Sequence, residues 1–359
     1  MDDRAPLADR LADDASRSVW QRLRRSLGVV LELCRFPAVF TALADPLLGL
    51  AIGFAVVLPL ANQDATIDEI WSELMSSFVI ACVVLASGSA YLFGMVLNDI
   101  VDRERDAIER PTRPIPSGRI GPAMAKLLAA GLAAAAITLS LPLHYFVGHF
   151  APAVVVVLLL ATIVAYTYAK NVPTLQRIGV GPALMGSCRA LNVLVGTSLL
   201  WVWTTTTLFN PSGWWDVAPI FHVPVLLATY VAGITVFASS EAIGGRRQPL
   251  VVGTGLVAIA FVGFAAVIAT TDGEPGSVSQ RVLLWPALGL LATWIAIPLV
   301  RAIRDPQPAK IGPAIGRMIV AIIPLDAVMA CAYVGSSFYV SLIAALIVPA
   351  VLMKRFRIT

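Results

Sequence analysis

The feature of this sequence that most constrains its fold is a succession of apolar runs, each long enough to cross a membrane. An α-helix of about 20 residues spans a hydrocarbon core of about 30 Å. Ten such runs lie near residues 36–60, 74–98, 121–143, 150–169, 178–202, 218–240, 248–271, 282–301, 312–333 and 336–353. Only Gly335-Ser336-Ser337 separate the last two, so the tenth is either a span or a re-entrant or interfacial piece. The sequence predicts an all-α fold, a polytopic membrane helix bundle of nine to ten transmembrane helices.

The composition excludes an ordinary soluble enzyme. Hydrophobic residues make up 58% of the chain and charged residues 13%, whereas about a quarter of a soluble protein is charged. The four cysteines stand singly in apolar runs, so neither a disulfide framework nor a zinc site is indicated. Residues 1–27 lack the apolar core of a signal peptide and are predicted to be a cytoplasmic segment, partly an interfacial helix. Residues 28–359 are predicted to form a single membrane-embedded domain.

The basic residues predict the orientation of the bundle. Lys and Arg collect in the cytoplasmic loops of membrane proteins. With the N-terminus inside, every Lys and Arg except Arg281 falls on the cytoplasmic side or in the cytoplasmic half of a span. This pattern explains the formal net charge of +4 without a nucleic-acid partner. It predicts an integral protein of a bacterial inner (cell) membrane, with both termini and the 98–126 region facing the cytoplasm.

An acidic cluster follows the second apolar run. Asp99, Asp102 and Asp106 are separated by three and four residues, so on a helix they lie within about 60° of arc, with Asn98 at its edge. The carboxylates on such a face repel one another at neutral pH. A divalent cation explains it best, because clustered oxygen ligands suit a hard ion such as Mg²⁺, which commonly links a few carboxylates to phosphate oxygens.

Two arginines follow the acidic face. Pro111 disfavours helical geometry at Arg110, so the helix is expected to end there and to leave Arg110 and Arg113 on a loop above the carboxylates. Guanidinium groups beside carboxylates are explained if a phosphate lies between them. The segment therefore predicts a Mg²⁺-diphosphate site, and the alternative is a solvated helix end of mixed charge.

These residues resemble a known family. Segment 98–106, Asn-Asp-x-x-Asp-x-x-x-Asp, with the tail Arg-Pro-x-Arg-Pro-Ile-Pro-Ser-Gly at 110–118, is similar to the first aspartate-rich motif of the UbiA superfamily of intramembrane prenyltransferases. Arg-Phe-Pro at 35–37 resembles the family's Arg-Pro-Pro, and Tyr-Thr-Tyr-Ala-Lys at 166–170 resembles its Tyr-x-x-x-Lys. With the number of spans, the resemblance covers roughly residues 28–333.

The resemblance implies a bundle around a lipid-open cavity, where two aspartate motifs hold two Mg²⁺ ions on a prenyl diphosphate. The metal stabilises the leaving group, the allylic C–O bond ionises, and an electron-rich acceptor captures the carbocation. By position, the first metal-binding set is Asn98 with the catalytic residues Asp99, Asp102 and Asp106. The predicted substrate-binding residues include Tyr166 and Lys170, which match positions that contact the diphosphate or close the cavity, and, from their charge, Arg110 and Arg113.

The sequence departs from the family at the second motif. An Asp-x-x-x-Asp pattern is expected between the sixth and seventh spans, but in segment 239–247 only Glu241 is acidic. Three alternatives follow: Glu241 binds the second metal with water, Arg246 or Arg247 replaces the charge of that metal, or the protein binds a prenyl lipid without transferring it. The two arginines are equally explained as charges that set the topology of a cytoplasmic loop.

Three charged residues lie near the middle of predicted spans: Asp45, Arg189 and Asp326. A charge at such depth costs at least about 2.5 kcal/mol on insertion scales, so each is expected to face the interior and find a partner. Arg189, with Asn192 one turn on, is predicted to face the cavity and bind substrate. Its partner is then either the diphosphate or Asp45, and the alternative is structural pairing between helices. Asp326 is predicted to be an interhelical partner.

The leading hypothesis is a Mg²⁺-dependent membrane prenyltransferase, which moves an isoprenoid chain from a prenyl diphosphate to a small acceptor such as an aromatic molecule. Its expected partners are the prenyl diphosphate, this acceptor and membrane lipid. One alternative keeps the fold and transfers a phosphosugar to a polyprenyl phosphate. The other is a non-catalytic carrier or permease for lipid-linked precursors, since buried charges also occur in transporters.

Overall fold

A computed structural model of the protein describes residues 26–57, 77–201, 218–241, 246–271, 278–334 and 343–348, together with Arg24. Within these ranges, nine helices are long and apolar enough to cross a membrane. They are α2 (Val39–Val57), α4 (Ser77–Val101), α6 (Pro122–Ser140), α8 (Ala151–Ala169), α10 (Val180–Thr197), α13 (Pro219–Ala238), α14 (Arg247–Thr270), α15 (Val278–Arg304) and α16 (Pro308–Val334). The predicted all-α membrane bundle is confirmed.

Short helices adjoin these spans. They are η1 (Phe36–Ala38), α5 (Arg103–Glu109), α7 (Leu143–Val147), α9 (Pro173–Arg177) and η3 (Ser198–Leu200). The tenth predicted run, 336–353, lies outside the described residues except for 343–348, so it stays a prediction. Most of the predicted N-terminal segment 1–27 also lies outside them.

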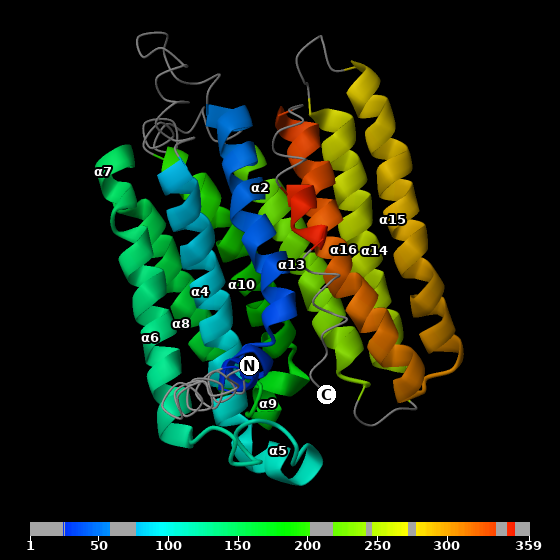
Figure 1. Ribbon diagram of the computed structural model, residues 1–359. Helices are drawn as coiled ribbons and strands as arrows, with labels where there is room; N and C mark the ends of the chain where they lie inside the picture. The colour runs from blue at the N-terminus through cyan, green and yellow to red at the C-terminus, as the bar shows by residue number, and fades with distance from the viewer. Residues whose placement is uncertain are drawn as a thin grey trace, which may run out of the picture.

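The spanning helices lie side by side with α2 in the middle (Figure 1). This helix contacts α4, α10 and α16, and 83% of its span is buried. The spans that include α6 and α15 lie toward opposite edges of the view and are only 22% and 28% buried. They therefore present most of their apolar side chains to lipid. At one end of the bundle lie α5 and α9, and at the other end lies α7 (Figure 1).

Two glycines let α2 and α10 pack backbone against backbone. A Cβ atom added at Gly49 of α2 would lie 2.0 Å from the Val193 carbonyl oxygen, and one added at Gly196 of α10 would lie 2.0 Å from the Pro46 carbonyl oxygen. Small residues permit this close approach in membrane bundles. The contact fixes α10, which carries Arg189, against the central helix.

We expect Gly196→Val to destabilise the bundle strongly, because the new side chain would have to push the α2 backbone away. Overpacking costs about 1–3 kcal/mol even where side chains can adjust. Thermal unfolding in detergent, followed by circular dichroism, measures the change. The matched control is Gly131→Val in α6, where an added Cβ meets nothing within 4 Å. Equal melting temperatures for the two variants would contradict the packing argument.

Candidate active site

The acidic face forms where α4 runs into α5. Helical hydrogen bonds continue through the junction, because the Asp102 amide donates to the Asn98 carbonyl (3.0 Å) and the Asp106 amide donates to the Asp102 carbonyl (2.8 Å). Asp99, Asp102 and Asp106 therefore lie along one face, as their spacing predicts. Their exposed fractions are 5%, 5% and 3%, so the face is turned into the protein. Buried carboxylates need partners, and the surrounding elements supply them.

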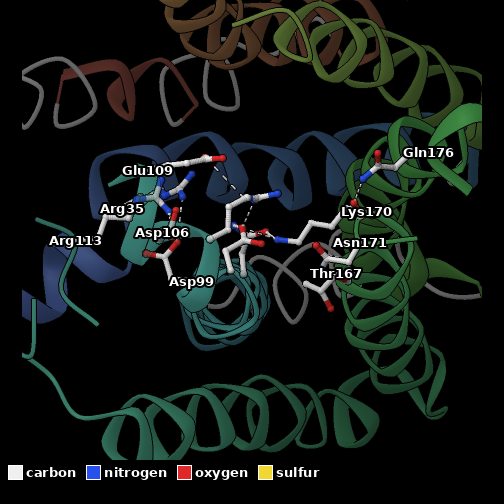
Figure 2. A network of polar contacts seen from close by, with 12 residues as sticks. Arg35, Asp99, Asp106, Glu109, Arg113, Thr167, Lys170, Asn171 and Gln176 are labelled. Carbon is white, nitrogen blue, oxygen red and sulfur yellow. Dashed lines mark hydrogen bonds and ion pairs between the residues drawn. The ribbon is translucent and has the colours of Figure 1, made fainter. Parts of the chain in front are cut away.

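The loop after α5 brings Arg113 onto this face. Ile115 and Ile120 anchor the loop because both are buried in the hydrophobic core. Arg113 Nη1 lies 3.2 Å from Asp99 Oδ1 and 2.6 Å from Asp106 Oδ2. One guanidinium group therefore bridges two carboxylates (Figure 2). This placement agrees with the prediction that Arg113 lies above the acidic face.

A second cation reaches the face from α8. Lys170 directly follows this helix, and its Nζ lies 2.8 Å from Asp102 Oδ2 and also donates to Asn98. Figure 2 shows the Lys170 side chain approaching from the side opposite Arg35 and Arg113. Burial lowers the pKa of the Lys170 ammonium group from its ordinary value, and the hydrogen bond and ion pair with Asp102 oppose that shift. Lys170 thus lies at the acidic motif, as the resemblance implies.

Two further cations at this face were absent from the predicted site. Arg35 Nη2 lies 3.1 Å from Asp99 Oδ1, and Arg105 Nη2 lies 3.0 Å from Asp102 Oδ2. Arg35 has a left-handed backbone (φ 47°, ψ 44°), which is rare for a residue other than glycine and is enriched at functional sites. The available sequence signals were the Arg-Phe-Pro stretch for Arg35 and the three-residue spacing from Asp102 for Arg105.

The carboxylate and amide oxygens of this face are ligands of the kind that Mg²⁺ takes, although the carboxylates do not converge on one point. Within the described ranges, no three His, Cys, Asp or Glu side chains form a ready metal-binding group. The second oxygen of Asp102, Oδ1, is buried and has no hydrogen-bond partner, while its Oδ2 accepts from Asn98 Nδ2 (3.1 Å). A buried carboxylate oxygen without a donor, among further carboxylates, is the kind of ligand that a hard cation takes.

A cavity of about 360 Å³ adjoins the acidic face. It lies between α2, α4, α8, α10, α13 and α16, and its walls are mainly apolar. Arg35, Asn98 and Tyr166 line it, and since Arg35 contacts Asp99 and Asn98 contacts Asp102, the cavity lies next to the acidic face. Tyr166 thus lies where the resemblance implies. The arrangement can hold an anionic head among charged groups and an apolar chain beside them.

Deeper in the bundle, Arg189 is paired with Asp45. Arg189 Nε lies 3.0 Å from Asp45 Oδ2, and Asn192 Nδ2 donates to the same oxygen at 2.6 Å. Asp326 is fully buried like Asp45 and lies close enough to interact with it electrostatically, but neither of its carboxyl oxygens has a hydrogen-bond partner. Arg189 and Asn192 both line the cavity. Of the two predicted partners for Arg189, the structure shows Asp45.

Two predicted ligands are not brought to the acidic face. Arg110 is exposed and makes none of the ion pairs of this face; its backbone (φ −143°, ψ 63°) ends α5 and leaves the helical path. Glu241 Oε1 would lie 3.0 Å from a Cβ added at Gly312 of α16, and it does not line the cavity. Arg247 donates to the Arg304 carbonyl oxygen at 3.4 Å. In the part of the chain that the structure describes, no second acidic set faces the first.

Comparison with known proteins identifies similar sequences. The profile described as the UbiA prenyltransferase family matches residues 67–318. Digeranylgeranylglyceryl phosphate synthase from Methanopyrus kandleri is 26% identical over 231 residues, which are 63% of this chain and 74% of that protein. The protein of the same name from Natronomonas pharaonis is 36% identical over 121 residues, which are 33% of this chain and 39% of that protein.

Solved structures share the fold at low sequence identity. The apo structure of a UbiA homolog from Aeropyrum pernix K1 matches with a TM-score of 0.56 and 16% identity, covering 79% of this chain and 96% of that one. A structure described as digeranylgeranylglyceryl phosphate synthase in membranes matches with a TM-score of 0.52 and 16% identity, covering 87% and 99%.

Proposed function

This chain belongs to the UbiA prenyltransferase family, and we propose that it transfers an isoprenoid chain from a prenyl diphosphate at the acidic end of α4 to a small acceptor in the adjoining cavity. In this reaction C1 of the chain loses its bond to a diphosphate oxygen and gains a bond to the acceptor, which releases a proton. The observation that carries the proposal is an apolar cavity of about 360 Å³ whose lining residues Arg35 and Asn98 contact the buried carboxylates Asp99 and Asp102.

Mg²⁺ would be held by Asp99, Asp102 and Asp106 with Asn98, and when bound it supplies charge stabilisation to the departing diphosphate. The carboxylates lie along the junction of α4 and α5, where continuous backbone hydrogen bonds orient them before substrate arrives. Their burial excludes water, and this strengthens every charge interaction at the site. The proposal therefore assigns the three aspartates the role of a fixed anionic platform.

The cationic side chains around this platform are proposed to bind the diphosphate. Arg113 lies on the loop after α5 and Lys170 directly after α8, and each has a charged nitrogen atom within 3.2 Å of an aspartate oxygen. Arginine forks and a lysine ammonium group are suited to phosphate oxygens. The apolar cavity is proposed to take the isoprenoid chain and keep water from the reacting carbon, with Tyr166 and Asn98 at the boundary.

The names of the related proteins indicate which class of acceptor to test first. Those reported above are named digeranylgeranylglyceryl phosphate synthases, so a glyceryl phosphate lipid takes precedence over an aromatic acceptor. The guanidinium group of Arg35 supports this choice, because it lines the cavity and its side chain is 43% exposed. It is thus accessible to an anionic acceptor head.

The active end of the bundle is proposed to face the cytoplasm. Arg113 follows α5 and Lys170 lies between α8 and α9, and α5 and α9 lie at the same end of the bundle (Figure 1). Basic residues favour the cytoplasmic side of a membrane. A cysteine is placed at the exposed position Arg103. A membrane-impermeant thiol reagent is expected to leave it unlabelled in intact cells and to label it after lysis. Labelling in intact cells would contradict the orientation.

Chelation of Mg²⁺ is expected to abolish prenyl transfer. Purified protein in lipid nanodiscs is given a panel of prenyl diphosphates with a glyceryl phosphate or aromatic acceptor, and pyrophosphate release and product mass are measured. EDTA should reduce both to background, and added Mg²⁺ should restore them, because an uncompensated diphosphate is a poor leaving group. Consumption that is indifferent to EDTA, or no consumption of any member of the panel, would refute the proposal and favour a carrier.

A further inference from the structure

The acidic face is already neutralised by the protein itself. Asp99 Oδ1 is shared by Arg35 (3.1 Å) and Arg113 (3.2 Å). Arg113 also holds Asp106 Oδ2 at 2.6 Å. Asp102 Oδ2 is surrounded by Lys170 (2.8 Å), Arg105 (3.0 Å) and Asn98 (3.1 Å). A cation that approaches this face must therefore compete with fixed positive charges for one oxygen of each aspartate, whereas Asp102 Oδ1 is buried and has no donor.

The competing cations are the same groups that a diphosphate would attract. A diphosphate carries more negative charge than one carboxylate, and charge-assisted hydrogen bonds to phosphate are strong. Arg113 lies on a loop and Lys170 at a helix end, and both have long side chains, so each can reach outward to a phosphate oxygen while its backbone stays in place. When they do so, they release the carboxylate oxygens that they now occupy.

We propose, on the basis of the function proposed above, that Arg113 and Lys170 form an exchangeable lock. In the empty site they hold the carboxylates of the acidic face, and in the loaded site they hold the diphosphate and leave those carboxylates to Mg²⁺. Metal and diphosphate then bind with positive coupling, because each removes an obstacle to the other. By thermodynamic reciprocity, the factor by which the diphosphate strengthens metal binding equals the factor by which the metal strengthens diphosphate binding.

Arg113 is the residue at which the lock can be tested most sharply. Among the described contacts, only its guanidinium group bridges two carboxylates of the face, Asp99 and Asp106. Arg113→Gln should therefore tighten binding of metal alone and weaken binding of diphosphate. A residue that served only to bind diphosphate would leave metal affinity unchanged, so the two roles are separable by a measurement that involves no catalysis.

The experiment measures Mn²⁺ binding to the full-length protein in nanodiscs by equilibrium dialysis, with free Mn²⁺ buffered, with and without a non-hydrolysable prenyl thiodiphosphate. For the unaltered protein, the analogue should raise Mn²⁺ affinity roughly tenfold, within the usual range of coupling between sites. Arg113→Gln should raise Mn²⁺ affinity without the analogue by a similar factor, and the remaining coupling should be small. Lys170→Gln should act in the same direction.

The matched control is Arg103→Gln, which removes an arginine from α5 that pairs with Glu104 at 3.3 Å. It should leave Mn²⁺ affinity and coupling unchanged. If Arg113→Gln fails to fold, Arg113→Lys, which keeps the charge but has a shorter side chain and no guanidinium fork for the diphosphate, should show an intermediate effect. Unchanged or weaker Mn²⁺ binding in folded Arg113 and Lys170 variants would overturn the lock.

The outcomes also separate the lock from the function on which it rests. If the unaltered protein binds Mn²⁺ and the analogue, but each with an affinity that is independent of the other, the proposed function stands and the lock is wrong. If it binds neither of them, the proposed function itself fails.

Discussion

Asp102→Asn is expected to reduce prenyl transfer roughly a hundredfold to a thousandfold, the loss typical of removing one group that stabilises charge in a transition state. Asp102 is the carboxylate with a buried, unpartnered oxygen, so it is the ligand best prepared to meet a metal. Asparagine keeps the shape and one acceptor oxygen but removes the negative charge. The measurement is the turnover of a prenyl diphosphate in nanodiscs at saturating Mg²⁺, compared with the unaltered protein.

Asp305→Asn supplies the control for that loss. Asp305 pairs with Lys310 between α15 and α16, and its side chain is 41% exposed, so the same chemical change is made away from the cavity. Its activity should match that of the unaltered protein. If Asp102→Asn kept more than a tenth of the activity while its thermal unfolding was unchanged, the acidic face would not be the place where leaving-group charge is stabilised.

The largest effect on stability is expected from Arg189→Met. This change leaves Asp45 and Asp326, both fully buried, side by side without the guanidinium group that lies 3.0 Å from Asp45. Breaking a buried ion pair by removing one partner costs about 3–5 kcal/mol, because the other charge remains unpaired. Thermal or denaturant unfolding in detergent should show a loss of this size.

A second substitution tests whether unpaired charge is the cause. Adding Asp45→Asn to Arg189→Met removes one of the two carboxylates and retains an amide next to Asn192. The double variant should therefore recover part of the lost stability, as expected when residues share one network. A double variant that is less stable than Arg189→Met would indicate that Asp45 acts through other contacts.

The parts of this molecule that follow from local pattern were predictable. The apolar runs predict the spans because a helix needs about 20 consecutive, mostly apolar residues to cross a membrane. The three aspartates share a face because their spacing matches the helical repeat. Arg113 was placed near them because it follows closely in sequence, and the structure puts its Nη1 2.6 Å from Asp106.

What depends on tertiary packing was harder to predict. Arg35 meets Asp99 although 64 residues separate them, and only the packing of α2 against α4 brings them together. Closeness in sequence was also misleading: Arg110 is nearer to the motif than Arg113, yet it leaves the helical path at the end of α5 and is exposed. Glu241 is the only acidic residue in segment 239–247, where the second motif is expected, but its carboxylate lies toward Gly312.

The most direct test of the central claim is a crystal structure of the protein with Mn²⁺ and a non-hydrolysable prenyl thiodiphosphate, in which anomalous scattering locates the metal. We expect an anomalous peak about 2 Å from an oxygen of Asp102, with the diphosphate beside Arg113 and Lys170 and the isoprenoid chain in the cavity next to Asn98. A bound analogue whose diphosphate and metal lie away from Asp99, Asp102 and Asp106 would contradict the account.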